Sequence, residues 1–229
     1  MSLFTIADLH LSLGTDKPMD IFYGWDNYLE RITDKWNKLI TDDDTVVIAG
    51  DISWAMKLSE CEKDFAYLNS LPGTKILLKG NHDYWWDTVS KINRFLDENK
   101  FDTIKVLFNN SYEIGDYAVC GTRGWGLDCE NNEDIKILNR ECGRLKLSLD
   151  SACESNKEKI VFLHYPPIYG DNVCKEIVNI LKEYNIKKCY YGHIHGGKMI
   201  KGAFNGEYES INFRLISCDA LNFTPLLVR

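Results

Sequence analysis

The stretch Val46-Val47-Ile48-Ala49-Gly50-Asp51 joins an apolar, β-branched run to a glycine and a carboxylate. Such a short apolar run is typical of a strand that is buried on both faces. The arrangement recurs along the chain, because a polar block follows each of five apolar runs: Asp8-Leu9-His10, Gly50-Asp51, Gly80-Asn81-His82-Asp83, His164 and Gly192-His193-Ile194-His195. Segments with helical periodicity separate these runs. The alternation predicts an α/β fold with a largely parallel core.

The five blocks contain all five histidines of the chain. Ligands of open α/β sheets bind at the carboxyl ends of the strands, so we expect these side chains to cluster there. At an extended strand end, a two-residue spacing would point Asp8 with His10, and His193 with His195, to one face. The donors suffice for two metal ions. Imidazole, carboxylate and amide without thiolate favour Mn, Fe, Co, Ni or Zn over Mg or Ca.

Length and composition set the wider limits. With 229 residues and 45% hydrophobic content, the chain is expected to form a single domain over 1–229. Its net charge of −7 and the lack of a Lys/Arg-rich run argue against nucleic acid as a partner. Eight cysteines without a Cys-x-x-Cys pair indicate reduced thiols. The early first strand leaves no room for a leader, and no apolar run approaches the roughly 20 residues of a membrane span. We therefore expect a cytoplasmic protein without a membrane partner; its oligomeric state stays open.

The elements between the blocks can also be placed. Helical periodicity is present in 25–39, 58–68, 89–96 and 173–184, and strands are expected over 104–108 and 112–120. A tight hairpin turn is predicted at 204–207. An acidic surface loop over 127–134 precedes apolar residues at alternating steps of three and four: Ile135, Leu138, Cys142, Leu145 and Leu149. This stripe fits a helix packed on its own sheet, or else a lid or dimer helix.

The ordered set D-x-H, G-D, G-N-H-D, H and G-H-x-H resembles the calcineurin-like metallophosphoesterase family over nearly the whole chain. The resemblance implies a four-layer α/β/β/α sandwich with two mixed sheets. It implies that one metal is bound by Asp8, His10, Asp51 and His195, and the other by Asp51, Asn81, His164 and His193. A hydroxide that bridges the two ions would then attack phosphorus in a small phosphomonoester or phosphodiester. The positive charge of two divalent ions exceeds the negative charge of the ligand carboxylates, so the site would attract phosphate.

The resemblance assigns a catalytic part to His82, which would protonate the leaving oxygen while Asp83 orients its ring. Departures from the family pattern limit which branch of the family the chain can resemble. The chain lacks the G-D-x-x-D-R-G of the serine/threonine phosphatases, and Trp54 stands where purple acid phosphatases have a tyrosine ligand. It is more similar to the small bacterial phosphohydrolases. A nuclease of the same family and a non-catalytic, metal-stabilised adaptor are the alternatives.

Two weaker signals concern the substrate. Arg123 has a planar guanidinium that suits a phosphate oxygen, although a structural arginine fits equally well. Trp85, with Trp54, Trp86 and Trp125, offers an aromatic wall for an apolar leaving group; packing in the core or at the rim is the alternative.

Overall fold

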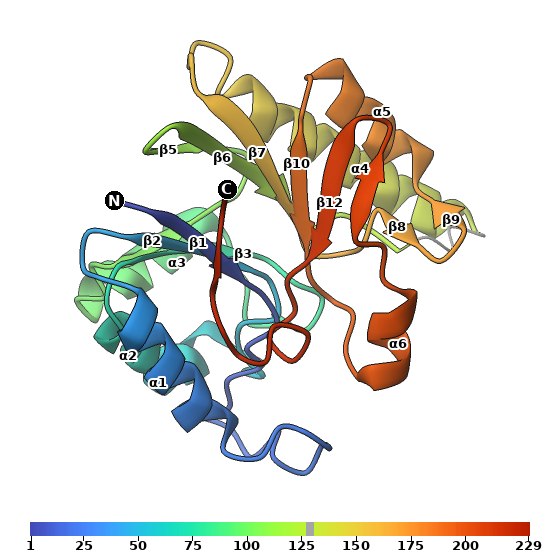
Figure 1. Cartoon of the computed structure of the whole chain (residues 1–229). Coiled ribbons are helices and arrows are strands. Elements are labelled where there is room, and N and C mark those ends of the chain that lie inside the picture. Colours follow the sequence, from blue (N-terminus) through green and yellow to red (C-terminus); the bar gives the residue numbers. More distant parts are fainter. Residues whose placement is uncertain (127–130) are drawn as a thin grey trace.

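The computed structural model describes residues 1–126 and 131–229, and their helices and strands form four layers (Figure 1). Two sheets face each other in the middle. Helices α1 (Tyr28–Leu39), α2 (Glu62–Ser70) and α3 (Val89–Glu98) lie outside the first sheet, and α4 (Asn132–Asp150) and α5 (Lys175–Glu183) lie outside the second. The expected α/β/β/α sandwich is confirmed.

The first sheet has the order β13-β1-β2-β3-β4. Its parallel strands are β1 (Leu3–Ile6), β2 (Thr45–Ala49), β3 (Thr74–Leu78) and β4 (Ile104–Val106). The C-terminal strand β13 (Leu226–Leu227) pairs antiparallel with β1 and makes the sheet mixed. A short helical turn, η1 (Leu58–Cys61), precedes α2.

The second sheet has the order β11-β12-β10-β7-β6-β5. Four central strands are parallel, and the edge strands β5 and β11 are antiparallel. The members are β5 (Tyr112–Ile114), β6 (Tyr117–Thr122), β7 (Glu158–Leu163), β10 (Lys188–Tyr191), β11 (Gly206–Tyr208) and β12 (Ile211–Leu215). A separate pair is formed by β8 (Ile168–Tyr169) and β9 (Asn172–Val173), and α6 (Gly197–Gly202) follows β10.

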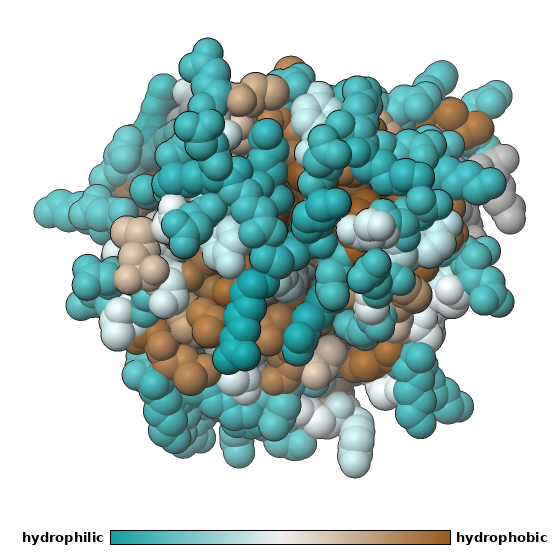
Figure 2. Space-filling view, turned by 45° about the horizontal axis from the view of Figure 1, so that its top comes forward, coloured by the Kyte–Doolittle hydropathy of each residue, from teal (hydrophilic) through white to brown (hydrophobic). Residues whose placement is uncertain are grey.

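Alternate side chains of each strand point to opposite faces of the sheet and so contribute to different parts of the core. In β2, Val46 and Ile48 pack under the helices of their own sheet, whereas Val47 and Ala49 face the other sheet. Burial on both faces explains why the apolar runs are continuous. Figure 2 shows that polar side chains cover most of the face over the upper part of Figure 1, with apolar surface in patches between them. Among the described helices, none combines the length and the hydrophobicity needed to cross a membrane.

The hairpin turn lies four residues later than the sequence predicted. Tyr208 pairs with Ile211, so Glu209 and Ser210 form the two-residue turn, both with positive φ (52° and 62°). Gly206 already belongs to β11, and the Asn205 side chain accepts a hydrogen bond from the Leu215 N–H. The turn-forming residues Asn205 and Gly206 therefore start the strand pairing, and the prediction at 204–207 was wrong.

Helix α4 packs on its own sheet, which fits the first of the two interpretations of its stripe. Leu138, Leu145 and Leu149 join the core over β6 and β7. The buried face also carries Glu141, whose carboxylate accepts hydrogen bonds from Thr122 Oγ1 (2.6 Å) and Arg144 Nη1 (2.5 Å). Residues 127–130 of the expected acidic loop lie outside the described residues.

Removing this buried carboxylate is expected to destabilise the protein. In Glu141→Ala the Thr122 hydroxyl and two partly buried guanidinium groups lose their acceptor, which should lower the free energy of unfolding by about 2 kcal/mol. Glu141→Gln keeps an acceptor for Thr122 and should lose less. Urea unfolding followed by circular dichroism measures both. Equal stability of Glu141→Ala and the natural protein would contradict the assignment.

Candidate metal centre

The candidate ligands lie on the loops that follow β1, β2, β3, β7 and β10, at one edge of the two sheets. The chain turns sharply there, because Asp8, His10, Asp51 and His193 all have left-handed backbone conformations (φ 62°, 47°, 50° and 73°). Such conformations are costly for residues other than glycine and concentrate at functional sites. The loops also approach each other closely: a Cβ added at Gly80 would lie 2.2 Å from the Asp51 N–H nitrogen.

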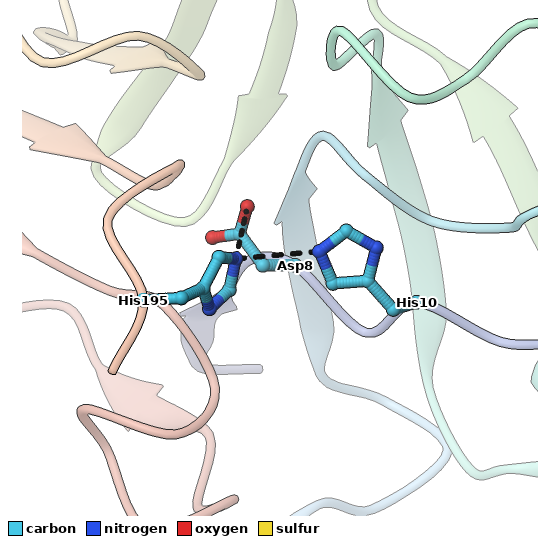
Figure 3. Close-up of side chains that lie close together, drawn as sticks. All are labelled: Asp8, His10 and His195. Atoms are coloured by element: carbon cyan, nitrogen blue, oxygen red, sulfur yellow. Dashed lines mark hydrogen bonds and ion pairs between the residues drawn. The ribbon is translucent and has the colours of Figure 1, made fainter. Parts of the chain in front are cut away.

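One donor group consists of Asp8, His10 and His195 (Figure 3). His195 Nε2 lies 3.3 Å from Asp8 Oδ1 and 3.3 Å from His10 Nε2. Asp8 and His10 come from the loop after β1, and His195 comes from the loop after β10. Asp8 and His10 are buried, whereas the His195 side chain is 27% exposed, so the group opens to solvent on one side.

A second donor group contains Asp51, His164 and His193, with Asn81 between them. Asn81 Oδ1 lies 2.6 Å from His164 Nε2 and 2.9 Å from His193 Nδ1. Asp51 Oδ2 lies 3.5 Å from His164 Nε2. The same oxygen lies 3.7 Å from His10 Nε2 of the first group. Asp51 therefore stands between the two groups, as a shared carboxylate would.

The distances between donor atoms within each group are those expected around a bound cation. Ligand atoms that lie about 2.1 Å from one ion are about 3 Å from each other, which is the spacing found in both groups. The imidazole nitrogens of His10 and His195 point at each other, and so do the donor atoms of Asn81 and His164. A divalent ion would bind all of them in the deprotonated form. The donor set suits Mn, Fe, Co, Ni or Zn.

The electrostatics point the same way. Burial, together with the nearby charges of Asp8 and Asp83, raises the pKa of Asp51 to about 9. Burial lowers the pKa of His164 to about 3. Burial also opposes ionisation of Asp8, but the neighbouring histidines outweigh it and hold its pKa below the ordinary value. Without a cation, the cluster cannot keep all its carboxylates charged. Positive charge between the two groups would remove this conflict.

Backbone and side-chain oxygens orient two of the imidazole rings through the ring nitrogen Nδ1. His164 Nδ1 lies 3.1 Å from the Ala49 carbonyl oxygen, and His195 Nδ1 lies 3.1 Å from Asp219 Oδ1. Metal-binding histidines commonly have such a partner on the second nitrogen. Sequence reasoning missed Asp219. Its position shortly after strand β12 was the available signal, but no histidine stands beside it there.

The pairing expected from an extended strand end is wrong for His193 and His195. These two side chains enter different donor groups. The reason is the backbone, since the positive φ of His193 ends the strand direction before the second histidine. The partition implied by the family resemblance, His195 with Asp8 and His193 with Asp51, agrees with the geometry. Whether these residues bind metal stays a prediction.

Asp83 does not orient His82. Its carboxylate is fully buried and accepts hydrogen bonds from backbone N–H groups of Gly80 (2.7 Å), Ile52 (2.8 Å) and Ser53 (3.3 Å), and from Trp85 Nε1 (3.0 Å). Asp83 thus ties the loop that carries Asp51 to the loop that carries Asn81. Its predicted catalytic role is corrected to a positioning role.

His82 itself lies beside the first donor group. Its ring centre is 5.7 Å from that of His10 and 4.6 Å from that of Trp54. Its backbone N–H donates to Asp51 Oδ1 (2.8 Å), and within the described structure its buried ring nitrogen Nδ1 has no hydrogen-bond partner. Burial lowers the pKa of His82 below its ordinary value. The ring is therefore held close to the candidate centre.

The two predicted substrate residues differ in outcome. Trp85 is only 2% exposed and packs edge-on against Phe65, so its prediction as a substrate contact is wrong and the packing alternative holds. Arg123 lies over the Trp125 ring (4.8 Å) with Nη2 3.5 Å from Glu141 Oε1. These contacts support the structural alternative, and its contact with phosphate stays a prediction.

Two face-to-face mixed sheets with carboxylate and imidazole groups converging at one edge are the arrangement of the metallophosphoesterase fold. The chain belongs to the calcineurin-like phosphoesterase family, whose model matches residues 1–197. It is similar in structure to a protein of unknown function, AQ665, from Aquifex aeolicus (TM-score 0.58, 16% identity, 99% of this chain and 95% of that one). It is also similar to the phosphopantetheinyl hydrolase PptH from Mycobacterium tuberculosis (TM-score 0.55, 15% identity, 94% and 88%). No curated protein matches the chain.

Proposed function

We propose that the protein is a binuclear metal-dependent phosphoesterase that hydrolyses a small phosphomonoester or phosphodiester. The observation that carries the proposal is the position of Asp51 Oδ2, within 3.7 Å of a donor atom in each group. Two divalent ions, when bound there, would supply a Lewis acid for the phosphoryl oxygens and a hydroxide at neutral pH.

The residues of the chain would hold and guide the substrate. Asp8 and Asp51 contribute the carboxylate charge of the centre, while its other donors, four imidazoles and the Asn81 amide, are neutral as ligands. Two divalent ions would therefore leave a positive surplus that attracts a phosphate in an otherwise acidic protein. His82 stands beside the centre and would protonate the departing oxygen.

The substrate is proposed to be small rather than a nucleic acid. A nuclease needs a basic track that binds the backbone phosphates, and the net charge of −7 offers little support for one. We also propose that the protein works in the cytoplasm. Cys61, Cys120 and Cys189 are buried thiols that form no disulfide, as expected for a reducing compartment.

The test is hydrolysis by purified protein loaded with manganese. Release of p-nitrophenol from p-nitrophenyl phosphate and bis(p-nitrophenyl) phosphate should require the metal, and the ratio of the two rates separates monoesterase from diesterase. Elemental analysis should find two ions per chain. Two bound ions without turnover on either ester, and without turnover on a panel of phosphorylated metabolites and cyclic dinucleotides, would favour the adaptor.

His82→Asn is expected to keep both ions and to lower kcat by about 100-fold or more, since a positioned proton donor contributes that much. The loss should be larger on phenyl phosphate than on p-nitrophenyl phosphate, because the poorer leaving group depends more on protonation. Steady-state kinetics and metal analysis measure the two effects. Full activity on both esters would remove the assignment.

A further inference from the structure

A cavity of about 410 Å³ opens directly beside the first donor group. Three imidazoles form its floor: His10, His82 and His195. The cavity therefore shares its floor with the candidate centre, and any group seated in it lies next to the ring proposed to protonate the leaving oxygen. The second donor group has a different neighbour, since the ring of His193 lies 4.4 Å from that of Tyr165.

The inner walls are aromatic and fixed. Trp25 is 4% exposed, approaches the His195 ring at 5.9 Å, and packs edge-on against Phe223. The periodicity predicted that the helix begins at Trp25. In the structure α1 begins only at Tyr28, so Trp25 precedes it. Trp54 stacks on His10 (4.8 Å, 22° between planes), and its Nε1 donates to Met19 Sδ. The walls and floor therefore form one packed unit.

The outer rim is apolar and exposed. Phe22 and Tyr23 line the cavity, yet they are 52% and 105% exposed, and neighbouring Ile21 is 73% exposed. They belong to the segment between β1 and α1. Adjacent exposed apolar side chains are unfavourable in water unless something covers them, and they commonly mark a binding site. Among the described residues that line the cavity, none has a carboxylate, ammonium or guanidinium group.

Building on the proposed function, we propose that this cavity binds a flat aromatic group carried by the departing oxygen of the phosphoester. Ring pairs at 4.5–7 Å are the usual geometry of aromatic contacts, and the walls offer several such partners. In the reaction, water forms a new P–O bond, the P–O bond to the aromatic moiety breaks, and one proton of that water reaches the departing oxygen. An aromatic group in the cavity places this oxygen beside His82.

The test compares two esters whose leaving phenols differ in ring area and little in acidity, phenyl phosphate and 2-naphthyl phosphate. With manganese-loaded protein, kcat/KM should favour the naphthyl ester by about tenfold, the size of effect that extra apolar contact gives in a pocket. The double variant Phe22→Ala/Tyr23→Ala should lower this ratio clearly, because the rim partners are lost while Trp25 and Trp54 remain. Ile21→Ala changes an exposed apolar neighbour that does not line the cavity, and should keep the ratio of the natural protein.

A second set of experiments identifies which kind of aromatic group binds in the cavity. It also separates the proposed aromatic site from the proposed phosphoesterase function. The ratio of kcat/KM for adenosine 5′-monophosphate over ribose 5-phosphate reports how much a nucleobase contributes. Comparison of this ratio with the naphthyl-to-phenyl ratio shows whether a nucleobase or a simple aryl group is preferred. If no ester is hydrolysed, the proposed function fails, and calorimetric binding of 2-naphthylphosphonate against methylphosphonate still tests the cavity. Equal naphthyl and phenyl constants, or a preference that the double variant retains, would overturn the inference while leaving the phosphoesterase in place.

Discussion

Asp51→Asn is expected to lower kcat/KM on p-nitrophenyl phosphate by about a thousandfold or more, since it removes charge from the position shared by both donor groups. Asp51 Oδ2 lies 3.7 Å from His10 Nε2 and 3.5 Å from His164 Nε2, so a neutral amide weakens both groups at once. Bound manganese should fall from two ions to one or none per chain. Steady-state kinetics and elemental analysis measure these losses.

The same substitution should stabilise the protein when metal is absent. The pKa of Asp51 is raised to about 9 by burial and by Asp8 and Asp83, whereas in the unfolded chain it is ordinary. A raised carboxyl pKa means that stability falls as pH rises from about 4 towards 9, and the amide removes this loss. Calorimetry at neutral pH should therefore give a higher Tm for metal-free Asp51→Asn than for the metal-free natural protein, and a smaller gain on adding manganese.

Asp44→Asn is the matched control, because Asp44 is a buried carboxylate at the opposite end of the same strand. Its two oxygens accept hydrogen bonds from the backbone N–H groups of Ser2 and Thr41, at the end of the strands opposite the candidate ligands. This control should lose stability while keeping both ions and full turnover. Two bound ions and unchanged turnover in Asp51→Asn would contradict the shared-carboxylate arrangement.

Asp83→Asn is expected to lower the free energy of unfolding by about 3 kcal/mol and the affinity for manganese by about 10- to 100-fold, although Asp83 belongs to neither donor group. Its two oxygens accept from Gly80, Ile52, Ser53 and Trp85. An amide has one acceptor oxygen, so its NH₂ group must face at least one of these donors. The loops that carry Asp51 and Asn81 should then move apart.

Urea unfolding and calorimetric manganese titration check both effects. Asp87→Asn, a few residues further along, changes an exposed carboxylate that pairs with Lys91 and should alter neither quantity. The outcome also decides between two roles for Asp83. If Asp83→Asn kept its stability and its metal affinity and lost only turnover on poor leaving groups, the role of orienting His82 would be restored.

Much of the architecture could be predicted from local sequence. Strands buried on both faces require continuous apolar runs, and polar residues follow where each run leaves the sheet, in some cases after a glycine, as in Val46 to Asp51. Because parallel strands end at one edge, the order of the blocks was enough to expect the convergence of Asp8, Asp51, His164 and the other candidate ligands. The helix on 135–149 could likewise be predicted, although the buried Glu141 on its inner face could not.

Only the tertiary structure decided how the candidate ligands are distributed between the two donor groups. The separation of His193 from His195 follows from a left-handed backbone, which a two-residue spacing does not reveal. Asp83 and Asp219 acquire their positions from contacts between distant loops, and Trp85 turned inward while Trp25 and Trp54 came to line the cavity. Local sequence sets which side chains follow each strand. The direction in which each one points depends on backbone turns and on packing partners far away in the chain.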